Sequence, residues 1–153
     1  MSYFSCTVEI TNSSTTILMN PEQFLPSGQC SVPLSPLLRP GSSGSASFTG
    51  PAGDDLDCQF TYNLPAKVAA LAVWFKVPSE RSNGSNNYQV ALFDPRSCDK
   101  KDLLQRMGKG SENDTPSTSR YGLVVRATMS DTANAVLKVD VSDLSLYDDK
   151  EEK

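Results

Sequence analysis

Residues 71–93 read LAVWFKVPSERSNGSNNYQVALF. The stretch is an apolar run that stops at Val77-Pro78, then a polar loop, then a second apolar run that begins at Tyr88. Residues 68–77 are apolar on both faces and rich in valine, alanine and aromatic residues, which is typical of a central strand covered on both sides. The stretch therefore predicts two neighbouring buried strands. Its polar loop is the first candidate for a functional surface, because loops carry binding residues more often than strands do.

Strand patterns recur on both sides of this hairpin. Apolar residues occupy every second position in residues 4–11 and again in 135–141, which indicates strands with one buried face. Prolines, glycines and serines break residues 32–53 into loops with one short strand. We expect strands at 4–11, 15–19, 45–49, 57–62, 68–77, 88–93, 121–129 and 135–141. Short strands between turn residues predict a mainly β protein, a sandwich of two antiparallel sheets.

One segment has helical spacing. In residues 99–107, DKKDLLQRM, the apolar residues fall at Leu103, Leu104 and Met107, and Gly108 follows where a helix stop is expected. The sequence therefore predicts one short helix that flanks the sandwich, with its apolar edge packed on a sheet.

Length and charge limit the class of protein. The 153 residues suit one domain, which we place at 1–145, followed by an acidic tail at 146–153. The 14 Lys and Arg against 18 Asp and Glu give a net charge of -4, so we expect no nucleic-acid partner. The chain contains no histidine, which excludes a Ser-His-Asp or Cys-His centre, and we expect neither an enzyme nor a cofactor.

The carboxylates of residues 54–57 and the four cysteines are the candidate metal ligands. Asp54, Asp55 and Asp57 suit either a calcium site or, as the default, a solvated acidic turn. The four cysteines, at 6, 30, 58 and 98, are too widely spaced for a zinc pair, and we expect free thiols rather than disulfides.

No secretory leader or membrane span is expected at the start of the chain. MSYFSCTVEI has neither a basic start nor an unbroken apolar run. We therefore expect a cytoplasmic or non-classically secreted protein that acts at membrane or cell surfaces.

The hairpin at 71–93 resembles the actinoporins, the pore-forming cytolysins of sea anemones. Further likeness comes from Val8-Glu9-Ile10-Thr11-Asn12, Tyr121-Gly122-Leu123 and residues 135–141. The stretches CTVEITN, MNP and VVRATM look most like the actinoporin-like proteins of bony fishes. The resemblance covers residues 6–143 and implies a sandwich flanked by a helix that adheres to membranes through one end.

The resemblance also implies a ligand site, in which this chain departs from the family. Anemone members hold phosphocholine in an aromatic cage, because aromatic faces attract quaternary ammonium groups. Here Ser79 and Arg81 stand where the family has tyrosines, and Lys76 stands where it has a serine. Among the loop positions only Tyr88 remains aromatic, because Asn83, Gly84 and Asn87 occupy the others. The full set of candidate ligand-binding residues is Lys76, Ser79, Arg81, Asn83, Ser85, Asn87, Tyr88, Leu103 and Met107.

These departures favour altered or lost phosphocholine recognition. Amides, cations and one ring suit a sugar or an anionic head group better than choline. In anemone members the pore is formed by an amphipathic helix that precedes the first strand. We expect no such helix in the few residues before Phe4, so we expect no pore from this sequence unless a longer precursor supplies the helix. The expected partners are membrane lipid head groups, with cell-surface glycans bound by a lectin on the same fold as the alternative, and homo-oligomers are left open. Two further interpretations remain. The protein serves as a scaffold for protein contacts, or the polar loop is solvated and only closes the hairpin.

Overall fold

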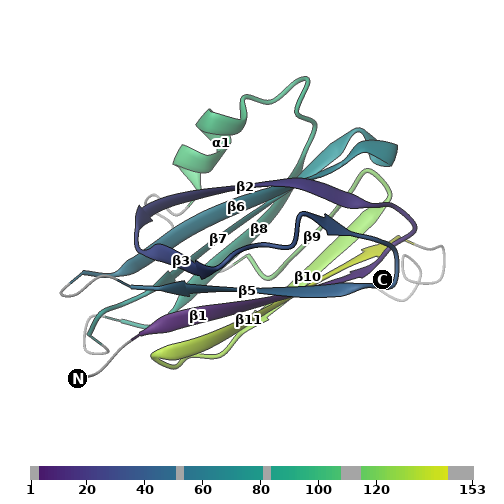
Figure 1. Ribbon diagram of the computed structural model, residues 1–153. Coiled ribbons are helices and arrows are strands. Elements are labelled where there is room, and N and C mark those ends of the chain that lie inside the picture. Colours follow the sequence, from purple (N-terminus) through teal and green to yellow (C-terminus); the bar gives the residue numbers. More distant parts are fainter. Residues whose placement is uncertain (1–3, 51–53, 81–83, 108–114, 145–153) are drawn as a thin grey trace, which may run out of the picture.

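The computed structural model describes residues 4–50, 54–80, 84–107 and 115–144. Within these residues the chain forms two stacked sheets with one α-helix outside them (Figure 1). The predicted mainly β sandwich with a single short flanking helix is confirmed.

Among the described residues, sheet A has six strands in the order β3-β5-β1-β11-β10-β9. They are β1 (Ser5–Ser13), β3 (Gln29–Val32), β5 (Ser43–Thr49), β9 (Ser117–Arg120), β10 (Leu123–Met129) and β11 (Asn134–Asp143). Sheet B has five strands in the order β4-β2-β6-β7-β8. They are β2 (Leu18–Ser27), β4 (Leu37–Leu38), β6 (Leu56–Leu64), β7 (Ala69–Val77) and β8 (Asn87–Phe93).

One strand pair departs from the antiparallel arrangement that the sequence predicted. β1 and β11 run parallel, with Val8 opposite Leu137 and Ile10 opposite Val139. They are the first and last strands of the described chain, so no tight turn has to join them, and a parallel pair is open to them. The other strand pairs of the two sheets are antiparallel.

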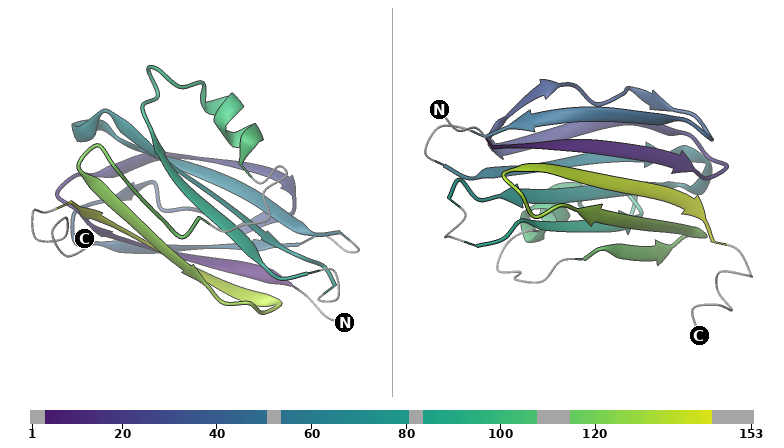
Figure 2. Two further views of the ribbon diagram at one scale, coloured as in Figure 1. Left: turned by 180° about the vertical axis from the view of Figure 1, so that it is seen from behind. Right: turned by 90° about the horizontal axis from the view of Figure 1, so that it is seen from below.

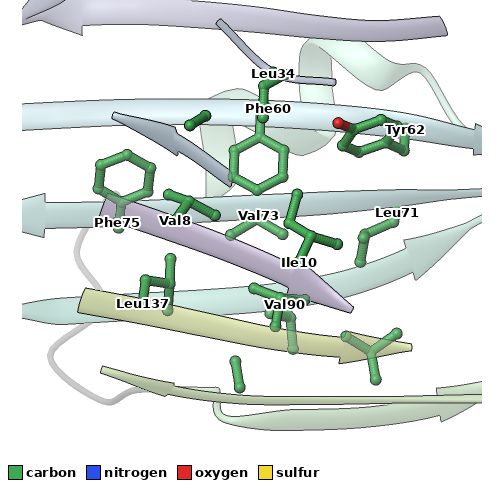
Figure 3. Close-up of a cluster of buried hydrophobic side chains, with 14 of the residues drawn as sticks. Val8, Ile10, Leu34, Phe60, Tyr62, Leu71, Val73, Phe75, Val90 and Leu137 are labelled. Atoms are coloured by element: carbon green, nitrogen blue, oxygen red, sulfur yellow. The ribbon is translucent and has the colours of Figure 1, made fainter. Parts of the chain in front are cut away.

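The core lies between the two sheets and follows from the two-residue period of the strands. Val8 and Ile10 point inward from β1, and Leu71, Val73 and Phe75 point inward from β7 (Figure 3). These side chains are at most 2% exposed, and the rings of Phe48 and Phe75 meet edge to face. Each fully buried side chain of this size contributes about 1.5–3 kcal/mol of apolar burial, which holds the two layers together.

Asn12 is the centre of a buried hydrogen-bond network. Its amide nitrogen donates to the carbonyl oxygens of Thr16 and Leu38 at 2.8 and 2.9 Å, and its amide oxygen accepts from Ser14. Asn12 is fully buried. It joins the turn after β1 to β4 of the other sheet and satisfies backbone groups that would otherwise be buried without partners.

The sequence pattern missed four short or irregular strands: β3, β4, β9 and most of β2. β2 continues through Pro21 and Pro26, where its pairing with β6 shifts register. β3 and β4 are outer strands, and β3 ends before Pro33. Proline is tolerated at edges and bulges because it needs no ladder donor there. The prolines of residues 32–53 are interpreted as loop markers in the sequence, and strands next to or containing prolines are therefore missed.

The helix α1 (Lys100–Arg106) lies on the face of sheet B that points away from sheet A (Figures 1 and 2). Asp99 caps it, because its side chain accepts from the backbone nitrogen of Lys101 at 3.0 Å. A second helical turn, the 3-10 helix η1 (Pro65–Lys67), joins β6 to β7. In the described part of the chain, neither helix is long and apolar enough to cross a bilayer.

Candidate functional site

A groove of about 690 Å³ lies between α1 and the outer face of sheet B. Three strands form its floor and one side, and α1 forms the other side. Its lining residues are Phe24 and Pro26 from β2, Asp57 and Gln59 from β6, Trp74 from β7, and Lys100, Lys101, Leu104, Gln105 and Met107 from the helix segment. This volume lies in the usual range of sites for small organic ligands.

The alternation of β7 explains why an apolar wall faces the helix. Phe75 and Val73 point into the core, so their neighbours Trp74 and Ala72 point outward. Leu104 and Met107 of the helix segment pack on this outward row and are buried with it. The result is a second apolar cluster, separate from the main core, that forms the inner end of the groove.

Two polar side chains of β6 line the floor beside this wall. The register places Asp57 opposite Lys76 and Gln59 opposite Trp74. The indole nitrogen of Trp74 donates to Oδ1 of Asp57 at 2.9 Å, and the side chain of Gln59 donates to the carbonyl oxygen of Leu104. The first bond fixes both the ring and the carboxylate. The second ties the end of α1 to the sheet.

Lys100 closes one rim of the groove. Its ammonium group pairs with Glu22 of β2 and lies 6.0 Å from the centre of the Phe24 ring. Ion pair and ring contact both join α1 to the edge of sheet B. Lys101, the next residue, is exposed at the same rim.

The thiol of Cys58, which lies behind the floor of the groove, is inert. Cys58 follows Asp57 on β6 and points into the core, where burial, followed by the negative charge of Asp57, raises the pKa of its thiol to about 12. All four cysteines carry free thiols. A thiol that stays protonated is a poor nucleophile, so Cys58 supplies packing and not reactivity.

The residues that the sequence analysis proposed for ligand binding do not form one site. Lys76 and Ser79 both contact Asp55: the ammonium group lies 3.6 Å from Oδ2, and the Ser79 backbone nitrogen donates to Oδ1 at 2.9 Å. Asp55 thereby holds the start of the polar loop. Arg81 and Asn83 lie outside the described residues.

The remaining candidates lie on different surfaces. Ser85 is exposed, and Asn87 lies beside Lys76 on the outer face of β8 and β7. Tyr88 points to the other side of that sheet and packs against the main core. Leu103 packs against the cluster that contains Trp74, and Met107 lines the groove. Of the seven candidates that the structure describes, it brings one, Met107, into the groove.

The sequence analysis did not propose most of the residues that line the groove. The position of Gln59 on β6 could have indicated them. Gln59 alternates with Cys58 and Phe60 on β6, so an outward position was occupied by an amide beside the outward Trp74 of the next strand. That pairing indicates a covered outer face. Phe24 gave no such signal, because it lies in a strand that contains prolines.

No cluster of three or more metal-binding side chains occurs in the described ranges, where Asp54, Asp55 and Asp57 are included. Asp55 and Asp57 instead accept hydrogen bonds from Ser79 and Trp74.

No family model matches the chain, and no curated protein matches it in sequence. Solved structures do match in fold. The lipid binding protein Nakanori is similar with a TM-score of 0.78 and 11% sequence identity, over 93% of this chain and 72% of that one.

Two other structures are similar over almost their whole length. The lectin XCL from Xerocomus chrysenteron gives a TM-score of 0.58 at 14% identity, over 92% of this chain and 100% of that one. IP-1A from Alcaligenes faecalis gives 0.55 at 14% identity, over 94% and 93%. At these identities the likeness shows a shared fold, and function has to be argued from the site.

Proposed function

We propose that this protein binds membrane lipids through the groove between α1 and sheet B. The observation that carries the proposal is the lining: buried Trp74, Leu104 and Met107 at the inner end and charged side chains at the rim. A head group with an attached apolar part needs both kinds of surface in one cavity. The protein would then act at membrane surfaces from the aqueous side.

Two further observations support a lipid over other ligands. The neighbour with a TM-score of 0.78 is named a lipid binding protein, and the resemblance of residues 6–143 to actinoporins points to membrane adhesion. We propose on the same grounds that the chain belongs to the actinoporin-like superfamily. Binding is the activity proposed for the groove, and pore formation is a separate step that dye release measures.

A glycan is the second candidate ligand, because a lectin shares the fold. The groove offers the carboxylate of Asp57 and the amide of Gln105 next to apolar side chains. Carboxylate and amide oxygens accept from sugar hydroxyls, and amide nitrogens donate to them. A glycan array with free sugars as competitors tests this alternative on the same protein.

The test of lipid binding is co-sedimentation with vesicles of phosphatidylcholine, phosphatidylethanolamine and cholesterol, with and without phosphatidylserine. Gln105→Trp places a large ring at an exposed lining position of α1 and should reduce vesicle binding at least tenfold. Arg106→Trp is the matched control, since Arg106 is the next residue of the same helix and does not line the groove.

The two variants separate the outcomes. Equal binding by both variants and the unmodified protein would show that lipid is bound elsewhere, and would refute the groove as the site. Absence of binding to all vesicles, together with a glycan hit that Gln105→Trp abolishes, would favour the lectin.

A further inference from the structure

Opposite charges face each other across the groove. Asp57 contributes a carboxylate from the sheet, whereas Lys100 and Lys101 contribute ammonium groups from the helix. Glu22 pairs with Lys100 at the rim. These four side chains sum to zero charge. A neutral groove with separated charges matches a zwitterionic ligand better than an anionic one, and the net charge of -4 on the whole chain adds no attraction to anionic surfaces.

Asp57 has an oxygen available for a ligand. Its Oδ1 accepts from the Trp74 indole, while no donor among the described residues hydrogen-bonds to its Oδ2. Its cross-strand neighbour Lys76 is paired with Asp55 at 3.6 Å. Asp57 is half-buried beside an apolar wall, where a charge-assisted hydrogen bond is stronger than in open water. The available oxygen therefore favours a positively charged N–H donor.

The aromatic rings of the groove do not form a cage for a quaternary ammonium. Such a cage requires open ring faces around the cation. Trp74 is only 3% exposed and its N–H is engaged by Asp57, while Phe24 already has the Lys100 ammonium 6.0 Å from its ring centre. A quaternary ammonium also has no N–H to give the carboxylate. The ligand cation that fits is a primary ammonium.

We infer that the groove selects the phosphoethanolamine group, a phosphate ester joined by two carbons to a primary ammonium. Asp57 accepts from the ammonium, and Lys101, with Lys100 beside it, pairs with the phosphate. The inference rests on the proposed function, because it names the head group that the lipid groove takes. The same chemistry exists in lipids and in soluble phosphoethanolamine, so the test has to distinguish these two sources.

The decisive experiment varies only the methylation of the head group. Vesicles carry equal fractions of phosphatidylethanolamine, its N-methyl and N,N-dimethyl derivatives, or phosphatidylcholine, so that the charge is constant while N–H donors are removed. Binding should fall at least tenfold from the first lipid to the last. Asp57→Asn should reduce binding of phosphatidylethanolamine to the level of phosphatidylcholine, although the asparagine oxygen still accepts from Trp74.

Asp140→Asn is the matched control. Asp140 lies on β11 of the other sheet and also accepts one hydrogen bond, from the Ser13 hydroxyl at 2.9 Å. Its substitution should leave binding of each vesicle unchanged. Lys101→Gln, at an exposed position, tests the phosphate side independently and should weaken binding of the whole methylation series to a similar degree.

The outcomes separate the inference from the proposed function. Equal binding across the methylation series would overturn the inference and leave lipid binding intact, whereas absence of binding to every vesicle would overturn both. Competition by soluble O-phosphoethanolamine would support the head-group chemistry without the membrane. Binding of phosphatidylethanolamine that Asp57→Asn does not change would also refute the inference.

Discussion

At the scale of single residues, Val68 has a backbone conformation that its side chain opposes. It ends η1 with φ 50° and ψ 45°, in the left-handed region. β-Branched residues rarely occur there, because the Cβ atom lies too close to the backbone. The side chain is 43% exposed, so its packing offsets little of this conformational strain. Val68 therefore stores local strain in the turn between β6 and β7.

We expect Val68→Asn to stabilise the protein by about 1 kcal/mol, because asparagine tolerates this conformation. Chemical denaturation followed by Trp74 fluorescence measures the change. Val32→Asn is the control: Val32 is similarly exposed but lies in β3, where asparagine is disfavoured, so no gain is expected. A loss of stability in Val68→Asn would mean that contacts of the valine outweigh the strain.

At the scale of elements, α1 depends on its contacts with the rest of the protein. Seven residues are too few for a helix that is stable alone in water. The Asp99 cap, the Gln59 bond to Leu104 and the apolar contacts of Leu104 and Met107 keep it in place. Because α1 forms one side of the groove, its stability decides whether the groove persists.

We expect Asp99→Ala to destabilise α1 by about 1 kcal/mol, since it leaves a first-turn N–H without its acceptor. Amide hydrogen exchange should accelerate at Leu103 and Met107 while the sheets remain protected. Asp102→Ala is the control, because Asp102 forms an exposed ion pair with Arg106 and does not cap the helix, and it should have a smaller effect. Equal acceleration throughout the protein would contradict a local role for the cap.

Some of the strands and the helix could be predicted from the sequence pattern, and others could not. The strands with alternating or fully apolar patterns, such as β1 and β7, were predictable, and so was α1 with its apolar edge. β2 was not, because its prolines are tolerated only through register shifts that long-range pairing creates, and β3 was not, because it is a short edge strand that ends next to a proline. The groove was harder still. Asp57 and Phe24 meet the helix only after three strands are arranged side by side, and no local pattern contains that arrangement.

At the scale of the whole molecule, the sandwich buries ionisable groups between its sheets. Cys6, Cys58 and Tyr62 are fully buried, and burial is the main cause that raises the pKa of each. For Cys58 the pKa rises from 9.0 to about 12. Between these two values the unfolded chain loses the thiol proton while the folded chain keeps it. The folded state then binds more protons, so stability falls as pH rises.

We therefore expect the free energy of unfolding to be constant up to about pH 9 and then to decline, by up to about 1.4 kcal/mol per pH unit for each buried group. Urea titrations between pH 7 and 11 measure the slope. Cys58→Ala should make the decline shallower, at the cost of some core packing at all pH values, whereas Cys98→Ala, outside the main core, should not change it. The same slope in both variants would show that the alkaline loss arises elsewhere, because the contribution of Cys58 requires a thiol that is protonated only while the two sheets enclose it.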